Sequence, residues 1–392
     1  MTCRLVLLLA LAASQAHAAP QAVHASEEPR DPAAPSSPAE PPAIDVRRAT
    51  EEAVGWLLEK QKPRGCWGSF ETRRVSEVLA SVPGSHHAFR VATTALCVIA
   101  LSDSPFQPPA ARRAIDKGID YLLEHYAVQR PNGMELYNVW AFGYTLQCFG
   151  EHLVKHPDDQ RAAALREACR RLIDKVALYQ CLDGGWGYYD FNAQTLHPSF
   201  TSMSFTTATV LVGLDRAQRA GVELPPRVIE RALTLLERAR TPAGTFVYDD
   251  ALRLVPRMGI NQAKGAACRT PLCQYALELF GKTVKTSDKV NALEELLVRQ
   301  TRFQKIASRR PIPHEAWYQI SGYFYLYGHA YAAYALERQP AEVQHRLWPA
   351  LFRSLLHCRQ PEGSFWDYPL YSYSKEYGTA FALIALSRIP QE

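Results

Sequence analysis

A repeat of about 60 residues constrains the fold of this chain more than any other feature. Six amphipathic helices are expected to end at regular intervals, each with apolar residues at i, i+3 and i+4 and charged residues between them. Each of these helices therefore has one buried face and one solvated face. Their final turns read GWLLEKQ (55–61), GIDYLLEHY (118–126), LIDKVALYQ (172–180), ALTLLERAR (232–240), ALEELLVRQ (292–300) and LFRSLLHCRQ (351–360).

Six helices of a different character alternate with these. Their cores are apolar on nearly every side and rich in Ala, Gly and Thr, which predicts burial all round. They read TALCVIAL (94–101), GYTLQCFG (143–150), TATVLVGL (207–214), TPLCQYAL (270–277), HAYAAYAL (329–336) and TAFALIAL (379–386). The alternation predicts an all-α fold, an α6/α6 toroid over 44–392 with six repeats of about 58 residues in two concentric rings. An open solenoid is the alternative, but it needs polar end caps, whereas the sixth inner helix is as apolar as the third.

A turn with glycine and an aromatic residue follows several of the outer helices. It reads QKPRGCWG at 61–68, QCLDGGWG at 180–187 and QPEGSF at 360–365, with a degenerate copy, RTPAGTF, at 240–246. The glycine suits a left-handed helix C-cap, and the glutamine amide can bond free backbone groups. We therefore expect these turns to tie the outer ring together.

The turn at 180–187 and the inner T-A-x-x-x-x-A-L pattern resemble the QW repeats of squalene–hopene cyclases and of the related protein prenyltransferase β-subunits. The resemblance covers residues 44–389. It implies an α6/α6 toroid with a central cavity, and chemistry on isoprenoids or lipids.

The first 43 residues lie outside this repeat. Arg4, the apolar run 5–13 and the Ala16-His17-Ala18 cleavage site predict a secretory signal peptide over 1–18. Residues 19–43 are rich in Pro, Ala, Ser and Glu, which predicts a disordered tether. We therefore expect an exported protein, periplasmic or secreted. The apolar run is too short to cross a bilayer, so no transmembrane segment is expected.

Composition excludes other classes. Hydrophobic residues make up 47% of the 392 residues and charged residues 21%, as in ordinary globular proteins. The net charge of +5 comes without a dense Lys/Arg stripe, so no nucleic-acid partner is expected. Eight cysteines follow the leader, which permits disulfides in an oxidising compartment, yet Cys97, Cys148 and Cys273 lie in apolar helical runs that suit small hydrophobes.

Acidic residues follow aromatic ones in the long loops between outer and inner helices, as in Tyr248-Asp249-Asp250. Carboxylates there suit N-caps of inner helices, a general acid at the cavity mouth, or a divalent-ion site. The resemblance to cyclases implies a D-x-D-D motif whose aspartate protonates an alkene. The nearest match begins at Val247 and lacks the first Asp, so catalysis is not established; Asp249 and Asp250 are the candidate acids.

His329 is the third candidate catalytic residue. It occupies the position held by threonine in four other inner helices, and we expect it in the cavity wall with a hydrogen-bonding partner. The resemblance to prenyltransferases implies zinc held by Asp, Cys and His at inner-helix starts. Only Cys268 and His329 occupy such places, because residue 266 is Ala. Catalytic zinc needs three protein ligands, so no metal is expected, with zinc at this pair as the alternative.

Aromatic residues at inner-helix starts suggest a ligand cavity, because buried tyrosine hydroxyls need polar neighbours. The candidate ligand-binding residues are Tyr137, Asn138, Trp140, Tyr318, Tyr323, Tyr327 and Tyr377. We therefore predict a terpene cyclase/prenyltransferase-like toroid whose aromatic-lined cavity binds an apolar or isoprenoid-like ligand. Two alternatives stay open: a non-catalytic scaffold with a protein partner on the toroid rim, and a carbohydrate-processing α/α-barrel enzyme with two carboxylates across its cavity.

Overall fold

The computed structural model describes residues 45–68, 83–130, 137–187, 202–300, 324–367 and 373–390, all within the unit Asp45–Glu392. The regular secondary structure of these residues is helical, with isolated β-bridges between turns. The signal peptide and tether of the sequence analysis lie outside the described residues and stay predictions.

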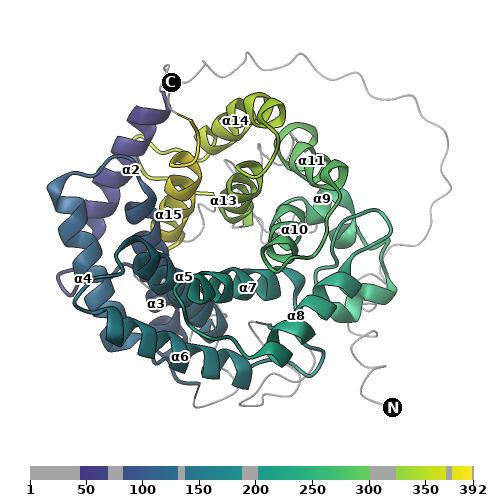
Figure 1. Cartoon of the computed structure of the whole chain (residues 1–392). Helices are drawn as coiled ribbons and strands as arrows, with labels where there is room; N and C mark the ends of the chain where they lie inside the picture. Colours follow the sequence, from purple (N-terminus) through teal and green to yellow (C-terminus); the bar gives the residue numbers. More distant parts are fainter. Residues whose placement is uncertain are drawn as a thin grey trace. The chain divides into compact units, whose positions relative to one another are not determined.

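Six of the described helices form an inner ring (Figure 1). They are α3 (Pro83–Asp103), α5 (Asn138–Lys155), α7 (Ser204–Arg219), α10 (Thr270–Leu279), α13 (Tyr325–Leu336) and α15 (Ser374–Leu386). Each packs against the next, and α15 packs against α3, so the ring closes. Most of their residues are buried, as the apolar pattern predicted. The closed toroid is therefore confirmed over the open solenoid.

The outer ring consists of helices with one wet face. They are α2 (Val46–Lys60), α4 (Pro109–His125), α6 (Ala162–Leu178), α8 (Pro226–Ala239), α11 (Thr286–Glu294), which continues as the π-helical η4 (Glu295–Arg299), and α14 (Ala341–Leu356). Each of the last five packs against the inner helix that precedes it, and α2 packs against α15. The first outer helix therefore covers the last inner helix. Between α8 and α10 the chain adds η2 (Asp250–Leu254), η3 (Gly259–Asn261) and α9 (Ala263–Ala266).

The repeated turns bind neighbouring outer helices together, as expected. The Gln61 amide donates to the Gly65 carbonyl at 2.9 Å and to the Ala114 carbonyl of α4 at 2.8 Å. The Gln180 amide repeats this pattern with Gly184 at 2.7 Å and Val228 of α8 at 2.9 Å. Gly184 adopts φ +107°, and a Cβ there would lie 2.7 Å from a carbonyl oxygen of α8. The turn therefore requires glycine at this position.

Charged groups also join the two ends of the ring. On the outer side, Arg359 after α14 pairs with Glu52 of α2. On the inner side, Arg388 after α15 pairs with Asp103 of α3 at 2.6 Å. These two ion pairs link the first repeat to the last.

None of the described helices combines the length and the apolar character needed to cross a bilayer. The eight cysteines of the described residues, from Cys66 to Cys358, are buried free thiols. The sequence left their pairing open, and none of them is bridged here. Those in inner helices fill space as small hydrophobes.

Candidate functional site

Aromatic side chains from four inner helices meet at the centre of the ring. The Trp140 ring of α5 lies 6.0 Å from the Tyr327 ring of α13 and 6.1 Å from that of Phe205 of α7. Helices α5 and α13 are not neighbours in the ring, so this contact crosses its centre. We name six residues the axial aromatic cluster: Trp140, Tyr144, Phe205, Tyr327, Tyr331 and Phe381.

The hydroxyls of this region find polar partners. Tyr327 Oη lies 2.9 Å from Thr209 Oγ1 and donates to the Phe205 carbonyl at 3.2 Å. Burial raises the pKa of Tyr144, Tyr327 and Tyr331, so all three stay neutral at ordinary pH. The axis therefore offers ring faces and uncharged hydroxyls, a surface suited to an apolar molecule.

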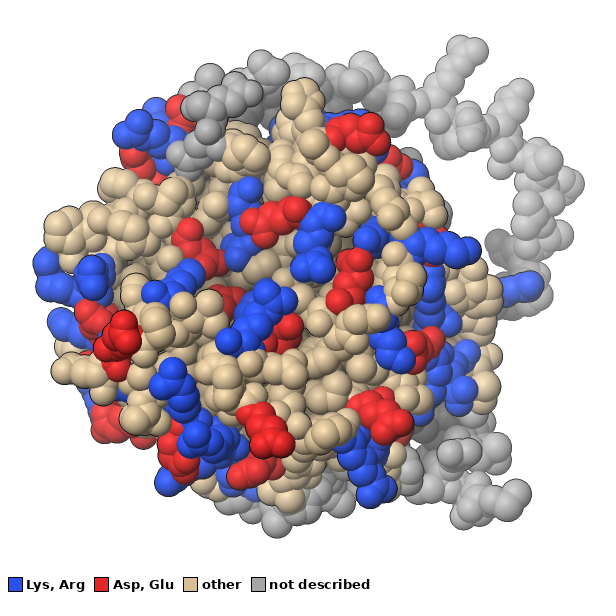
Figure 2. Space-filling model, in the orientation of Figure 1, with Lys and Arg blue, Asp and Glu red and all other residues tan. Residues whose placement is uncertain are grey.

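Four charged residues, each only 11–12% exposed, lie near the C-terminal ends of inner helices. They are Asp103, Glu151, Arg216 and Arg388, and we name them the closing charge layer. Arg216 pairs with Glu151 at 3.2 Å, and the Arg388 guanidinium stacks 3.7 Å from the centre of the Tyr334 ring. Burial and the nearby Asp103 carboxylate raise the pKa of Glu151. Figure 2 shows charged side chains of both signs around the centre of one face of the molecule.

The repeat pattern did not indicate this layer, although the sequence holds a signal for it. Glu151, Arg216 and Arg388 each follow a residue on the axis by seven positions, namely Tyr144, Thr209 and Phe381. A spacing of seven returns to the same helix face. When the axis-facing residues of each inner helix are followed to the end of the helix, these three charged residues are therefore expected at the axis.

A second aromatic group lies at the starts of the inner helices, where Phe89 contacts three tyrosines. Its ring centroid lies 6.0 Å from that of Tyr137, 5.2 Å from that of Tyr373 and 5.9 Å from that of Tyr377. Tyr137 adopts φ +70°, a conformation that non-glycine residues rarely take and that surrounding contacts must maintain. The structure therefore brings the candidates Tyr137 and Tyr377 together, while Tyr318 and Tyr323 lie outside the described residues.

Asn138 lies elsewhere. One helical turn later on the same face, Phe142 packs against Tyr179 at the end of outer helix α6, with ring centroids 5.8 Å apart. The Asn138 side chain is buried, and its Nδ2 has no hydrogen-bonding partner among the described residues. Its helix face therefore points toward the outer ring and away from the axial aromatic cluster.

The two candidate acids are adjacent but differ in environment. Asp249 Oδ1 accepts from the Ala251 amide at 2.7 Å, which makes Asp249 the N-cap of η2. Burial and the nearby carboxylates of Asp183 and Asp250 raise the pKa of Asp249 to about 6. Asp250 instead makes a bidentate ion pair with Arg238 of outer helix α8, at 3.0 Å to each oxygen. The ion pair therefore ties Asp250 to the outer ring.

The threonine position that His329 occupies has a structural purpose in other repeats. Thr94, Thr207 and Thr379 accept from the backbone amides of Trp67, Trp186 and Phe365 at 2.9–3.0 Å. These bonds fix each repeated turn to the inner helix of the same repeat. A side chain at this position therefore points toward the repeated turns and the outer ring.

The expectation of His329 in the cavity wall is corrected accordingly. Its Nδ1 donates to the Tyr325 carbonyl at 2.8 Å, and the two rings lie 4.1 Å apart. The Tyr325 hydroxyl donates to the Ser354 carbonyl of α14, which places this face of α13 against the outer ring. Cys268 instead packs against Gly328, and among the described residues no group of three or more His, Cys, Asp or Glu is arranged to hold a metal.

Burial lowers the pKa of His329 to about 4, which predicts a pH effect on stability. As pH falls from about 6.5 toward 4, the unfolded chain takes up a proton at this position before the folded chain does. Folding stability is therefore lost on acidification, at up to about 1.4 kcal/mol per pH unit. In urea titrations, His329→Gln is expected to flatten this part of the pH profile. Equal slopes for both proteins would show that His329 titrates normally.

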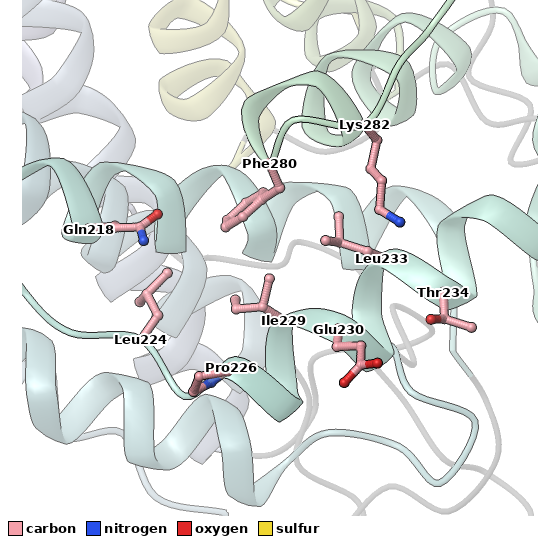
Figure 3. Close-up of a pocket in the computed structure, with 9 residues that line it drawn as sticks. All are labelled: Gln218, Leu224, Pro226, Ile229, Glu230, Leu233, Thr234, Phe280 and Lys282. Atoms are coloured by element: carbon pink, nitrogen blue, oxygen red, sulfur yellow. The ribbon is translucent and has the colours of Figure 1, made fainter.

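A groove of about 430 Å³ lies on the outer ring, apart from the axis (Figure 3). It runs between α8 and the turn after α10, and the side chains of Leu224, Ile229 and Phe280 point toward one another across it. Lys282 on its rim pairs with Glu237 at 3.1 Å. It contains none of the candidate catalytic or ligand-binding residues of the sequence analysis.

The comparisons identify the family. The model for the squalene-hopene cyclase C-terminal domain matches residues 39–253, which is more than half of the chain. The chain belongs to the squalene-hopene cyclase C-terminal domain family. The resemblance inferred from the repeats is thereby confirmed. A search of curated proteins finds no match for this cyclase-family chain.

Solved structures share the fold of this family member. The type II terpene cyclase MstE from Scytonema, in complex with geranylgeranyl dihydroxybenzoate, is 16% identical, with a TM-score of 0.51 over 88% of this chain and 97% of its own. An alpha-1,6-mannanase from Salegentibacter is 9% identical, with a TM-score of 0.57 over 88% and 100%. A protein from Actinoplanes is 15% identical, with a TM-score of 0.54 over 88% and 99%. Likeness at such identities shows the fold alone.

Proposed function

We propose that this chain is an exported terpene cyclase-like toroid whose axial aromatic cluster binds an apolar or isoprenoid-like ligand. The observation that carries the proposal is the contact between Trp140 and Tyr327 across the centre of the ring. The two rings meet edge to face, so aromatic side chains occupy the centre of the ring of helices. Their faces bind hydrocarbon chains and stabilise cations.

Two further observations support the proposal. The hydroxyls at the axis are neutral, and the closing charge layer pairs its carboxylates with guanidiniums, so no unpaired charge has to be desolvated by an apolar ligand. MstE, which shares the fold, is named with a geranylgeranyl substrate. The rings contact one another in this structure, so binding of a ligand among them requires their side chains to rotate apart.

The carbohydrate alternative draws on the mannanase neighbour and on the ability of aromatic faces to stack sugars. A hydrolase of that kind needs two carboxylates that flank the substrate. Of the two adjacent acids here, Asp250 is held by Arg238 and Asp249 caps η2. Neither acid can flank a sugar without giving up these contacts, which favours an apolar ligand over a sugar.

Native mass spectrometry of the full chain with geranylgeraniol or mannotriose tests the proposal. We expect one geranylgeraniol adduct and no mannotriose adduct. Tyr331→Leu removes a ring of the axial aromatic cluster and is expected to weaken the adduct about tenfold. Tyr126→Leu is the matched control, because its ring contacts Phe149 on the outer side of α5. A mannotriose adduct alone would support the carbohydrate alternative, and a bare chain would support the scaffold.

A further inference from the structure

The axis-facing residues become more polar from the starts of the inner helices toward their ends. On α5 they share one helix face through spacings of three and four, and they are Trp140, Tyr144, Gln147 and Glu151. The same order recurs on two other helices, with Phe205, Thr209 and Arg216 on α7 and Tyr327, Tyr331 and Tyr334 on α13. Polarity along the axis therefore changes in one direction.

Contacts between α5 and α13 show that the two helices change together. Near their starts, the Trp140 ring lies 6.0 Å from that of Tyr327. Further along, Gln147 Nε2 donates to the Tyr334 hydroxyl at 3.1 Å, and also to Glu151 of the closing charge layer at 3.0 Å. The axis therefore passes from aromatic rings, through hydroxyls and an amide, to charged side chains.

The hydroxyls in the middle of the axis form one group. Thr209 Oγ1 and Tyr327 Oη lie 2.9 Å apart, and the Phe205 carbonyl lies 3.0 Å from the first and 3.2 Å from the second. Burial raises the pKa of Tyr331, and hydrogen bonding with Thr209 and Tyr144 partly offsets this rise, so Tyr331 lies beside both. We name Tyr144, Thr209, Tyr327 and Tyr331 the axial hydroxyl group.

This group has more acceptor positions than protons. A hydroxyl carries one proton and two lone pairs. The protons of Thr209 and Tyr327 are used on the Phe205 carbonyl or between the two hydroxyls. Tyr144 and Tyr331 can likewise donate to a neighbouring hydroxyl of the group. Lone pairs are left over, so a polar group that enters here binds best if it is a hydrogen-bond donor.

We propose that the axial site prefers an isoprenoid alcohol, whose hydroxyl donates to the axial hydroxyl group and whose hydrocarbon chain lies against Trp140 and Phe205. The proposal rests on the proposed function and adds to it the polar end of the ligand and its direction, with the hydroxyl toward the closing charge layer. A hydrocarbon leaves the spare lone pairs unpaired, and an ether or a ketone brings acceptors without a donor. A carboxylate would add a charge beside acceptors.

Native mass spectrometry with two matched ligands tests the preference. The full chain is titrated with geranylgeraniol and with its methyl ether, which has the same chain but no hydroxyl proton. We expect the alcohol to bind about fivefold more tightly, the value of one net hydrogen bond. Thr209→Val keeps the shape of the side chain and removes one hydroxyl. It is expected to lower the ratio of the two affinities to about 1–2 while binding of the ether changes less than about twofold.

Thr145→Val is the matched control, because it makes the same substitution at another buried threonine of an inner helix. Thr145 follows Asn138 by seven positions and so lies on the face of α5 that points toward the outer ring. This variant should keep the preference of the wild type for the alcohol. If Thr209→Val does not fold, Tyr327→Phe removes the other hydroxyl of the pair and is expected to lose the preference in the same way.

Each outcome decides a separate point. Equal affinity of the wild type for alcohol and ether, or an unchanged preference in Thr209→Val and Tyr327→Phe, overturns the proposal. Absence of both adducts contradicts the proposed function itself. Photolabelling tests the direction: a diazirine beside the hydroxyl should label residues around Tyr334, and one at the far end of the chain should label residues around Phe205. The reverse pattern would overturn the proposed direction.

Discussion

Replacing Arg388 by methionine is expected to lower the free energy of unfolding by about 3–5 kcal/mol. Arg388 is 12% exposed and pairs with Asp103 at 2.6 Å and with Glu337 at 3.3 Å. Its guanidinium also stacks on Tyr334 and donates to the Ile384 carbonyl at 2.7 Å. Methionine fills similar space but leaves the buried Asp103 carboxylate with Lys155 as its remaining ion-pair partner. Urea unfolding of both proteins measures the difference.

Arg359→Met is the matched control, because Arg359 also joins the last repeat to the first, through Glu52. This pair is more exposed, so its loss is expected to cost less than about 1 kcal/mol. If both variants lose the same free energy of unfolding, any ion pair between the first and last repeats contributes equally, whatever its burial. We expect the larger loss at Arg388, because its pair with Asp103 is less exposed than the pair of Arg359 with Glu52.

The second large effect is expected for Trp186→Ala, at about 3–5 kcal/mol. Trp186 is fully buried, and its Nε1 donates to the Val176 carbonyl at 2.8 Å at the end of α6. Its backbone amide donates to Thr207 Oγ1 of α7, so one residue connects the outer ring to the inner ring. Alanine leaves a cavity at this junction and an unpaired carbonyl in α6.

Trp366→Ala serves as the comparison for Trp186→Ala. Trp366 is half-buried in the sixth repeated turn, and its Nε1 donates to Ser374 Oγ at 2.9 Å. Truncation there removes less buried surface, so a loss of about 1–2 kcal/mol is expected. Thermal unfolding ranks the two variants. A larger loss of stability for Trp366→Ala would show that Trp186 contributes little to joining the outer ring to the inner ring.

The fold was predictable from the sequence because its signal is local and repeated. The apolar faces of the outer helices and the all-round apolar cores of the inner helices follow from helical spacing alone. Closure followed from the apolar sixth inner helix, and α15 indeed packs against both α3 and α2. The glycines of the repeated turns, such as Gly65 and Gly184, have positive φ as expected.

The candidate site was predictable in part. The tyrosine stripe of α13 correctly indicated an aromatic axis, and Trp140 and Tyr327 do meet there. His329 was misplaced because helical spacing gives relative angles on a helix but not which angle faces the axis. That direction follows from the threonine bonds to the turns, which are tertiary contacts.

The closing charge layer could not be predicted from the sequence of a single repeat either. Asp103 and Arg388 are 285 residues apart and meet only because the ring closes. A pattern confined to single helices shows each charge at the end of an apolar stripe but not its partner. Their pairing is therefore a consequence of topology.

Photoaffinity labelling tests the central claim most directly. The full chain is incubated with a diazirine derivative of geranylgeraniol, irradiated and digested, and labelled peptides are sequenced by mass spectrometry. If the axial aromatic cluster binds the ligand, we expect labels on the segments that carry Trp140, Phe205 and Tyr327, with competition by unlabelled geranylgeraniol. Labels confined to the outer groove around Leu224 and Phe280, or labelling without competition, would contradict it.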